Sequence, residues 1–171
     1  DEIKAALDLN RATSIGEARA AYKPWKTPTW NIMLADRDGH IGYQTIGAIP
    51  LRARPKLGFR VATNADDRWQ GAIPFDGLPA MRDPERGWIA SANNQTAPDD
   101  FPYPLAGAWT PEDRFPRIVT MMGERAPHSL ETMHRMQTDV FSARGVKAAS
   151  GIVAAIPDPA SEIEAAALSA L

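Results

Sequence analysis

Proline and glycine dominate the middle of this chain and constrain its fold more than any other feature. The 171 residues include 15 prolines and 12 glycines, and the prolines concentrate between Pro50 and Pro116. Proline lacks an amide donor and glycine weakens regular elements, so both interrupt helices and strands. The sequence therefore predicts a long, irregular middle. Loops of this length in a compact domain are usually functional or pack against another part of the structure.

Two short helices and a β-hairpin are predicted before this middle. An apolar face predicts a helix from Asp1 to Asn10, and Ser14, with Glu17 three residues later, predicts a second helix from Ile15 to Tyr22.

The hairpin is predicted between residues 30 and 46. A strand run from Trp30 to Ala35 is followed by turn residues from Asp36 to Gly39 and then by alternation from Ile41 to Thr45. The Asp36 turn resembles the start of a calcium loop only superficially, because its glycine comes too early and the later glutamate is missing. We interpret it as a turn, and His40 as a hairpin side chain.

Helices are also predicted at the C-terminal end. Thr110-Pro111-Glu112-Asp113 has the composition of a helix start, and that helix should run to about Met122 with Pro116 near its beginning. Three segments follow: a helix that starts at Ser129, an Ala-rich stretch from Ser142 to Ala155 interrupted by Gly145 and Gly151, and a last helix opened by Asp158-Pro159 that reaches Leu171. The fold class predicted from these elements is α+β, with helices at both ends.

Composition excludes several classes of function. The chain carries 19 basic and 21 acidic residues without a cationic run, so we expect no nucleic-acid partner. Its apolar stretches are shorter than the roughly 18 residues that span a bilayer, so we expect no membrane partner. It contains no cysteine, which excludes disulfides, zinc-thiolate sites and a cysteine nucleophile.

Familiar catalytic motifs are missing from the sequence. It contains no Gly-x-Ser-x-Gly elbow, and the spacing of His40, His128 and His134 fits no zinc signature, so no metal ligand is predicted. A pair of catalytic carboxylates is a geometric property that sequence does not reveal, and an α+β enzyme of that kind stays an alternative.

The most unusual local feature is an apolar run, Trp88 to Ala92, that ends in the adjacent amides Asn93 and Asn94. The run predicts a buried strand. Asparagine is favoured in turns, so these amides can simply bond their own backbone at a strand end. Alternatively, the strand holds a carboxamide N–H at a reacting centre, where it stabilises an oxyanion.

An ordered series of motifs resembles the penicillin acylase family of N-terminal-nucleophile amidohydrolases. The resemblance covers most of the chain up to about Ser142. Its motifs are the segment Asn31 to Pro50, the series W-x-G-x-I-P-F-x-x-L-P from Trp69 to Pro79, Ala92-Asn93-Asn94, Tyr103-Pro104, Trp109, Arg114, Arg117-Ile118 and Gln137-x-Asp139. The turn Asp83-Pro84 departs from the family, in which Asn-Pro is more common at this place.

The resemblance implies a mechanism and assigns two site residues. In such enzymes a serine made N-terminal by self-cleavage attacks an amide carbonyl, and its own α-amine is the general base. Asn93 matches the family's oxyanion donor, and Arg114 matches the arginine that orients this asparagine and the substrate. Asn94 is the alternative to Asn93 in register.

The resemblance also implies what surrounds this chain. We expect residues 1–171 to be a single segment of a penicillin acylase-like β-chain from a larger precursor, inactive by itself, because Asp1 supplies no N-terminal serine. The strands should contribute to an αββα sandwich with the remaining α- and β-chain segments as partners. Apolar surface should be exposed where those segments pack.

The expected substrates are linear amides: the side-chain amides of β-lactams, N-acyl homoserine lactones or similar N-acyl compounds. No cofactor is expected, although a structural calcium in the parent protein could take one ligand from the loop with Asp99 and Asp100. The family implies a periplasmic or secreted location. A non-catalytic binding module with the same architecture stays the alternative function.

Overall fold

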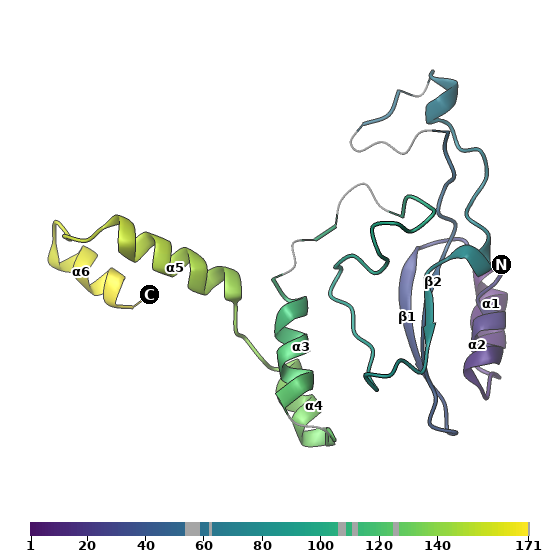
Figure 1. Ribbon diagram of the computed structural model, residues 1–171, viewed down its shortest axis with the longest axis horizontal. Coiled ribbons are helices and arrows are strands. Elements are labelled where there is room, and N and C mark those ends of the chain that lie inside the picture. The colour runs from purple at the N-terminus through teal and green to yellow at the C-terminus, as the bar shows by residue number, and fades with distance from the viewer. Residues whose placement is uncertain (54–58, 62, 106–108, 111–112, 125–126, 171) are drawn as a thin grey trace. The chain divides into compact units, whose positions relative to one another are not determined.

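The computed structural model describes residues 1–53, 59–61, 63–105, 109–110, 113–124 and 127–170 (Figure 1). The chain divides into two compact units, Asp1–Thr110 and Pro111–Leu171, which are described separately. This division does not test whether the chain is one segment of a longer β-chain, which stays a prediction.

The first unit is built on a three-stranded antiparallel sheet (Figure 1). Its strands are β1 (Trp30–Ala35), β2 (Ile41–Ile46) and β3 (Ala80–Arg82), in that spatial order. Strands β1 and β2 form the predicted hairpin, with Trp30 opposite Ile46 and Ala35 opposite Ile41. The third strand was not predicted, because three residues among turn-forming neighbours give too short a pattern.

The hairpin loop confirms the interpretation of Asp36 as a turn residue. Its carboxylate accepts hydrogen bonds from the backbone amides of Asp38 at 3.2 Å and His40 at 3.0 Å. Gly39 has a φ of 89°, which glycine adopts without steric cost. His40 is a hairpin side chain whose Nδ1 lies 2.8 Å from a carboxylate oxygen of Asp83.

Two helices, α1 (Glu2–Leu9) and α2 (Ile15–Ala21), confirm the N-terminal predictions within two residues. Ser14 caps α2 by accepting a hydrogen bond from the Glu17 amide at 3.2 Å. Helix α2 contacts both β1 and β2, and α1 packs on α2 (Figure 1). The two helices therefore lie on one side of the hairpin.

The buried centre of this unit lies on β2. Ile46 is completely buried, and Gln44 is 1% exposed. The side-chain oxygen of Gln44 accepts a hydrogen bond from Arg19 Nε at 2.7 Å. The side-chain nitrogen of Gln44 donates to the backbone carbonyl of Thr45 at 2.8 Å. This buried amide is therefore satisfied within the fold.

A second apolar cluster organises the proline-rich middle. Its buried members are Ile49, Ile73 and Leu78, and Leu51, Phe75, Tyr103 and Leu105 pack against them. Phe75 packs against the cluster and anchors this loop. Trp69 is no such anchor, because it is 60% exposed and its ring lies under the guanidinium of Arg52. A cation–π contact keeps this ring at the surface of the described structure.

The predicted strand from Trp88 to Ala92 is wrong, because these residues belong to none of the three strands. Side chains satisfy part of the backbone here. Arg86 Nε donates to the Trp88 carbonyl at 2.9 Å, and the Asn94 side chain accepts from the Ala92 amide at 2.9 Å. Such local bonds offer the backbone an alternative to a sheet ladder.

The second unit is helical. Its helices are α3 (Phe115–Glu124), α4 (Leu130–Gln137), α5 (Ala143–Ala155) and α6 (Glu162–Ser169). Helices at both ends of the chain were predicted, and this part of the fold class is confirmed. The sheet and helices agree with a mixed α and β fold.

Helix α3 begins later than predicted. Residues 111 and 112 lie outside the described part of the chain, and the first helical hydrogen bond runs from the Ile118 amide to the Arg114 carbonyl at 3.1 Å. Arg114, not Thr110, therefore occupies the N-cap position. This start places Pro116 in the first turn, where an amide has no helical acceptor anyway.

The starts of the later helices are set by serine caps. The helix predicted to start at Ser129 is α4, and Ser129 and Thr132 form a capping box there. Helix α6 begins at Glu162 instead of near Pro159, because the Ser161 side chain caps it by accepting from the Glu164 amide at 3.2 Å. The last residue of the predicted helix, Leu171, lies outside the described residues.

Much apolar surface of the second unit is exposed in this chain. Leu130, the first residue of α4, and Val140, which lies beyond its end, are 91% and 93% exposed. Apolar area is therefore uncovered in this unit, and its burial by other segments of a parent protein stays a prediction.

We expect Gly42→Val to destabilise the first unit. A Cβ at position 42 would lie 2.9 Å from Ile15 Cγ2, and Ile15 is buried where α2 meets the sheet. Overpacking of this kind costs about 1 to 3 kcal/mol. Chemical denaturation of the 171-residue chain measures it, with Ala35→Val at an exposed strand position as the control. Equal stability of both variants would contradict close packing of α2 on β2.

Candidate functional site

Asn93 lies at the end of the irregular segment that follows β3. Its φ is 62°, in the left-handed region that asparagine tolerates better than most residues. Its carbonyl accepts a hydrogen bond from the Thr110 amide at 3.2 Å. The residue is exposed in this chain. A side chain held here on a constrained backbone is a candidate donor to a substrate.

Asn94 has a different environment from its neighbour. It is 6% exposed, its side-chain oxygen accepts from the Ala92 amide at 2.9 Å, and its side-chain amide donates to the Gln95 carbonyl at 2.9 Å. The carboxamide therefore bonds the backbone on both sides of Asn93. Of the two roles that the sequence left open for this pair, the backbone-bonding role belongs to Asn94. The oxyanion role of Asn93 stays a prediction.

The loop after Asn94 is held by its own polar side chains. Gln95 donates from its side-chain amide to the Ala97 carbonyl at 2.9 Å and to Asp99 Oδ1 at 2.8 Å. Across the described residues, no three His, Asp or Glu side chains lie close enough to hold a metal ion. We therefore assign no metal ligand in this loop and derive no step through a metal.

Arg114 lies in the second unit, directly before α3, and it is exposed. The next arginine, Arg117, forms a two-pronged ion pair with Asp139: Nε and Nη2 each lie 2.9 Å from one carboxylate oxygen. This pairing lowers the pKa of Asp139, an effect reinforced by a backbone hydrogen bond from Phe141. Sequence analysis missed the pair, since residues 22 positions apart give no local signal.

A second ion pair lies on the other side of Arg114. Arg144 Nε is 3.2 Å from Asp113 Oδ2, and Arg144 belongs to α5. The residues directly before Arg114 and one turn after it are therefore both tied to later parts of the unit.

The remaining histidines lack the arrangement of a catalytic base or metal ligand. His128 Nε2 lies 2.9 Å from the Met122 carbonyl, where it caps the end of α3, and its Nδ1 is buried without a hydrogen-bond partner. His134 lies on an exposed face of α4. In the described residues, these positions give no support to a Ser-His-Asp or zinc site.

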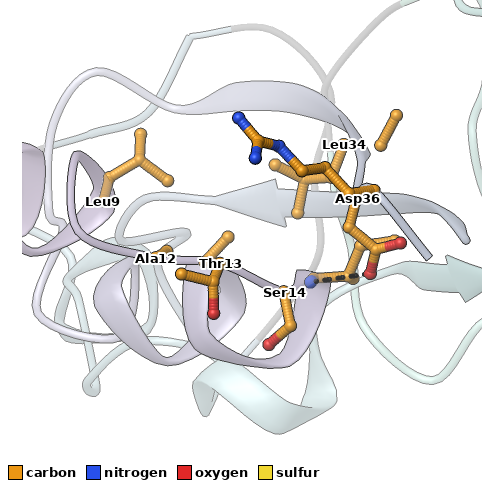
Figure 2. A pocket seen from close by; sticks show the side chains of 10 residues that line it. Leu9, Ala12, Thr13, Ser14, Leu34 and Asp36 are labelled. Carbon is orange, nitrogen blue, oxygen red and sulfur yellow. Dashed lines mark hydrogen bonds between the residues drawn. The ribbon is translucent and has the colours of Figure 1, made fainter.

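A hollow of about 650 Å³ between the α1–α2 link and the end of β1 is structural (Figure 2). Thr13 and Ser14 lie on one side of it, and Leu34 and Asp36 on the other. The Asp36 carboxylate already accepts from backbone amides, including that of Ile15 at 3.4 Å. These bonds explain its lowered pKa, and its role is to join the hairpin turn to α2.

Comparison with known proteins decides the family. The profile described as penicillin amidase matches residues 1–171. The chain belongs to the penicillin amidase family. The acyl-homoserine lactone acylase QuiP of Pseudomonas aeruginosa strain PAO1 is 32% identical over 142 residues, which are 80% of this chain and 16% of that protein. The penicillin acylase 2 proenzyme of Pseudomonas sp. strain SE83 is 26% identical over 132 residues, 77% of this chain and 17% of that protein.

A solved structure supports the same relationship. The thermostable penicillin G acylase from Alcaligenes faecalis is 25% identical and gives a TM-score of 0.63, covering 79% of this chain and 25% of that chain. This penicillin amidase family chain therefore spans about a sixth to a quarter of the length of its relatives. Those relatives are named as acylases, which hydrolyse amide bonds. In the part of the chain that the structure describes, no helix is long and apolar enough to cross a membrane.

The two asparagines should respond differently to substitution. Asn94→Ala removes the hydrogen bond from the buried Ala92 amide to the Asn94 side chain and should lower the free energy of unfolding by about 1 to 3 kcal/mol. Asn93→Gly keeps the left-handed backbone and should change it by less than about 0.5 kcal/mol. Urea denaturation of both variants of the 171-residue chain measures this. Comparable losses in both would contradict the separate roles.

Proposed function

We propose that this chain supplies the oxyanion-binding Asn93 and the orienting Arg114 to an amidohydrolase whose serine nucleophile lies in another segment of the same protein. The substrates are linear N-acyl amides: the side-chain amides of β-lactams, N-acyl homoserine lactones or similar compounds. The observation that carries the proposal is the Asn93–Asn94 pair, within a chain of the penicillin amidase family.

The proposed reaction moves one proton to the serine's α-amine and develops one negative charge on the substrate's carbonyl oxygen. The serine hydroxyl adds to the substrate carbonyl while the serine's own α-amine takes the hydroxyl proton. The carbonyl oxygen becomes negative, and the Asn93 side-chain N–H donates a hydrogen bond to it. The α-amine then passes its proton to the departing amine, and water hydrolyses the acyl-enzyme in the same way.

Asn93 is suited to this task because its surroundings hold its backbone in advance. The Asn94 side chain bonds the residue before Asn93 and the residue after Asn94, and the Thr110 amide bonds the Asn93 carbonyl. A donor fixed before the charge develops needs little reorganisation during the reaction.

Arg114 completes this half of the site in the proposal. Arg114 takes the role that the family resemblance assigns to it, which is to orient the oxyanion-binding asparagine and the substrate.

The remaining parts of the protein are proposed to cover surfaces that this chain leaves exposed. Met33 and Met81 are each 41% exposed, and both pair with Tyr43 across the sheet, so they share one face. In an αββα sandwich this face would meet a second sheet from the remaining α- and β-chain segments. Self-cleavage of a precursor, a periplasmic or secreted location and a calcium ion held mainly by those segments belong to the same proposal.

The experiment compares variants of the complete protein that carries this chain, with a chromogenic acyl amide as substrate. Asn93→Gly and Asn93→Asp should each lower kcat by about 10²- to 10³-fold, because both remove the N–H donor while tolerating the left-handed backbone. Arg114→Ala should lower kcat as well.

Asn10→Asp, at an exposed asparagine on the end of α1, is the matched control and should leave kcat unchanged. Full turnover in both Asn93 variants would overturn the site assignment. A folded wild-type protein that binds N-acyl compounds and never cleaves them would favour a binding module instead.

A further inference from the structure

Arg117, in the first turn of α3 and three residues after Arg114, forms an ion pair with Asp139. We infer that Arg117 and Asp139 are positioning residues that fix the start of α3 and thereby the location of Arg114. This inference rests on the function proposed for Arg114.

The pair has the geometry of a rigid contact. Both prongs of the Arg117 guanidinium meet the Asp139 carboxylate at 2.9 Å, and the two side chains are only 30% and 20% exposed. A two-pronged pair fixes orientation as well as distance, which a lysine could not do. The ring of Phe141 lies 4.8 Å from the Arg117 guanidinium carbon and covers it.

The pair joins the start of α3 to the chain just after α4. Helix α4 ends at Gln137, so Asp139 lies just beyond it, whereas Arg117 lies in the first turn of α3. At the other end, His128 bonds the Met122 carbonyl near the end of α3. The two contacts hold opposite ends of α3 against the segment that contains α4.

Arg114 is coupled to this contact through helical backbone. Its carbonyl accepts the first hydrogen bond of α3, from Ile118, so Arg114 precedes Arg117 by less than one turn. The neighbouring residue on the other side, Asp113, is paired with Arg144 of α5. The backbone of Arg114 is thus held by a charged contact on each side. The ion pair between Arg117 and Asp139 is the shorter of the two, at 2.9 Å compared with 3.2 Å for Asp113 and Arg144.

A double-mutant cycle in the complete protein separates positioning from general stability. Asp139→Asn removes the charge and should lower kcat by about 10-fold with little change in KM, because a small displacement of a catalytic group weakens the transition state more than binding. In an Arg114→Ala background, the same substitution should lower kcat no further.

Two further variants complete the test. Arg117→Asp combined with Asp139→Arg restores an ion pair and should recover part of the lost kcat. Arg135→Gln, which removes an exposed arginine on α4, is the control and should leave kcat unchanged.

The outcomes distinguish the two proposals. If Arg114→Ala is inactive and Asp139→Asn is as active as the wild type, the positioning role is overturned and the proposed function stands. If Asp139→Asn lowers kcat equally in both backgrounds, the pair acts through stability and the inference is again overturned. Full activity of Arg114→Ala would overturn the function of Arg114 and the inference with it.

Discussion

The proposed site depends on the two hydrogen bonds that the Asn94 side chain makes to the backbone. The Ala92 amide is buried where water cannot satisfy it, and the Asn94 carboxamide accepts its hydrogen bond and returns one to the Gln95 carbonyl. A buried donor left without a partner is costly, so this turn has one favoured conformation. The left-handed backbone of Asn93 is part of that conformation, and its exposed side chain follows from it.

The same solution recurs elsewhere in the first unit, in the hairpin and in the proline-rich middle. Carboxylates replace strand partners at several backbone amides: Asp36 accepts from His40, Asp83 from Ile41, and Asp67 from Val61. A chain rich in proline and glycine cannot form long ladders, and side-chain acceptors satisfy the amides that ladders would have used. The bond from Ile41 is the main reason why the pKa of Asp83 lies below its usual value.

Sequence alone predicted the elements that local chemistry decides and missed those decided by distant contacts. The Ser14 and Ser129 caps and the Asp36 turn depend on neighbours within four residues, so they could be predicted. The predicted Trp88 strand failed because an apolar run shows periodicity without showing whether a partner strand exists. The start of α3 was misplaced by the Thr110-Pro111-Glu112-Asp113 pattern, since the first helical hydrogen bond is accepted by the Arg114 carbonyl instead.

The two proposed site residues are held by different physical means, and this difference bears on pH. The Asn94 contacts involve no titratable group, whereas the Arg117 contact requires Asp139 to be ionised. Because pairing lowers the pKa of Asp139, its stabilising effect is complete above the ordinary carboxyl pKa and is lost only as the pH falls through the lowered one. An N-terminal amine titrates at about 7.7 to 8.0, far above that range. In the proposed mechanism, the dependence of turnover on pH near neutrality would therefore follow the amine of the proposed serine nucleophile, while the arrangement around Arg114 stays constant.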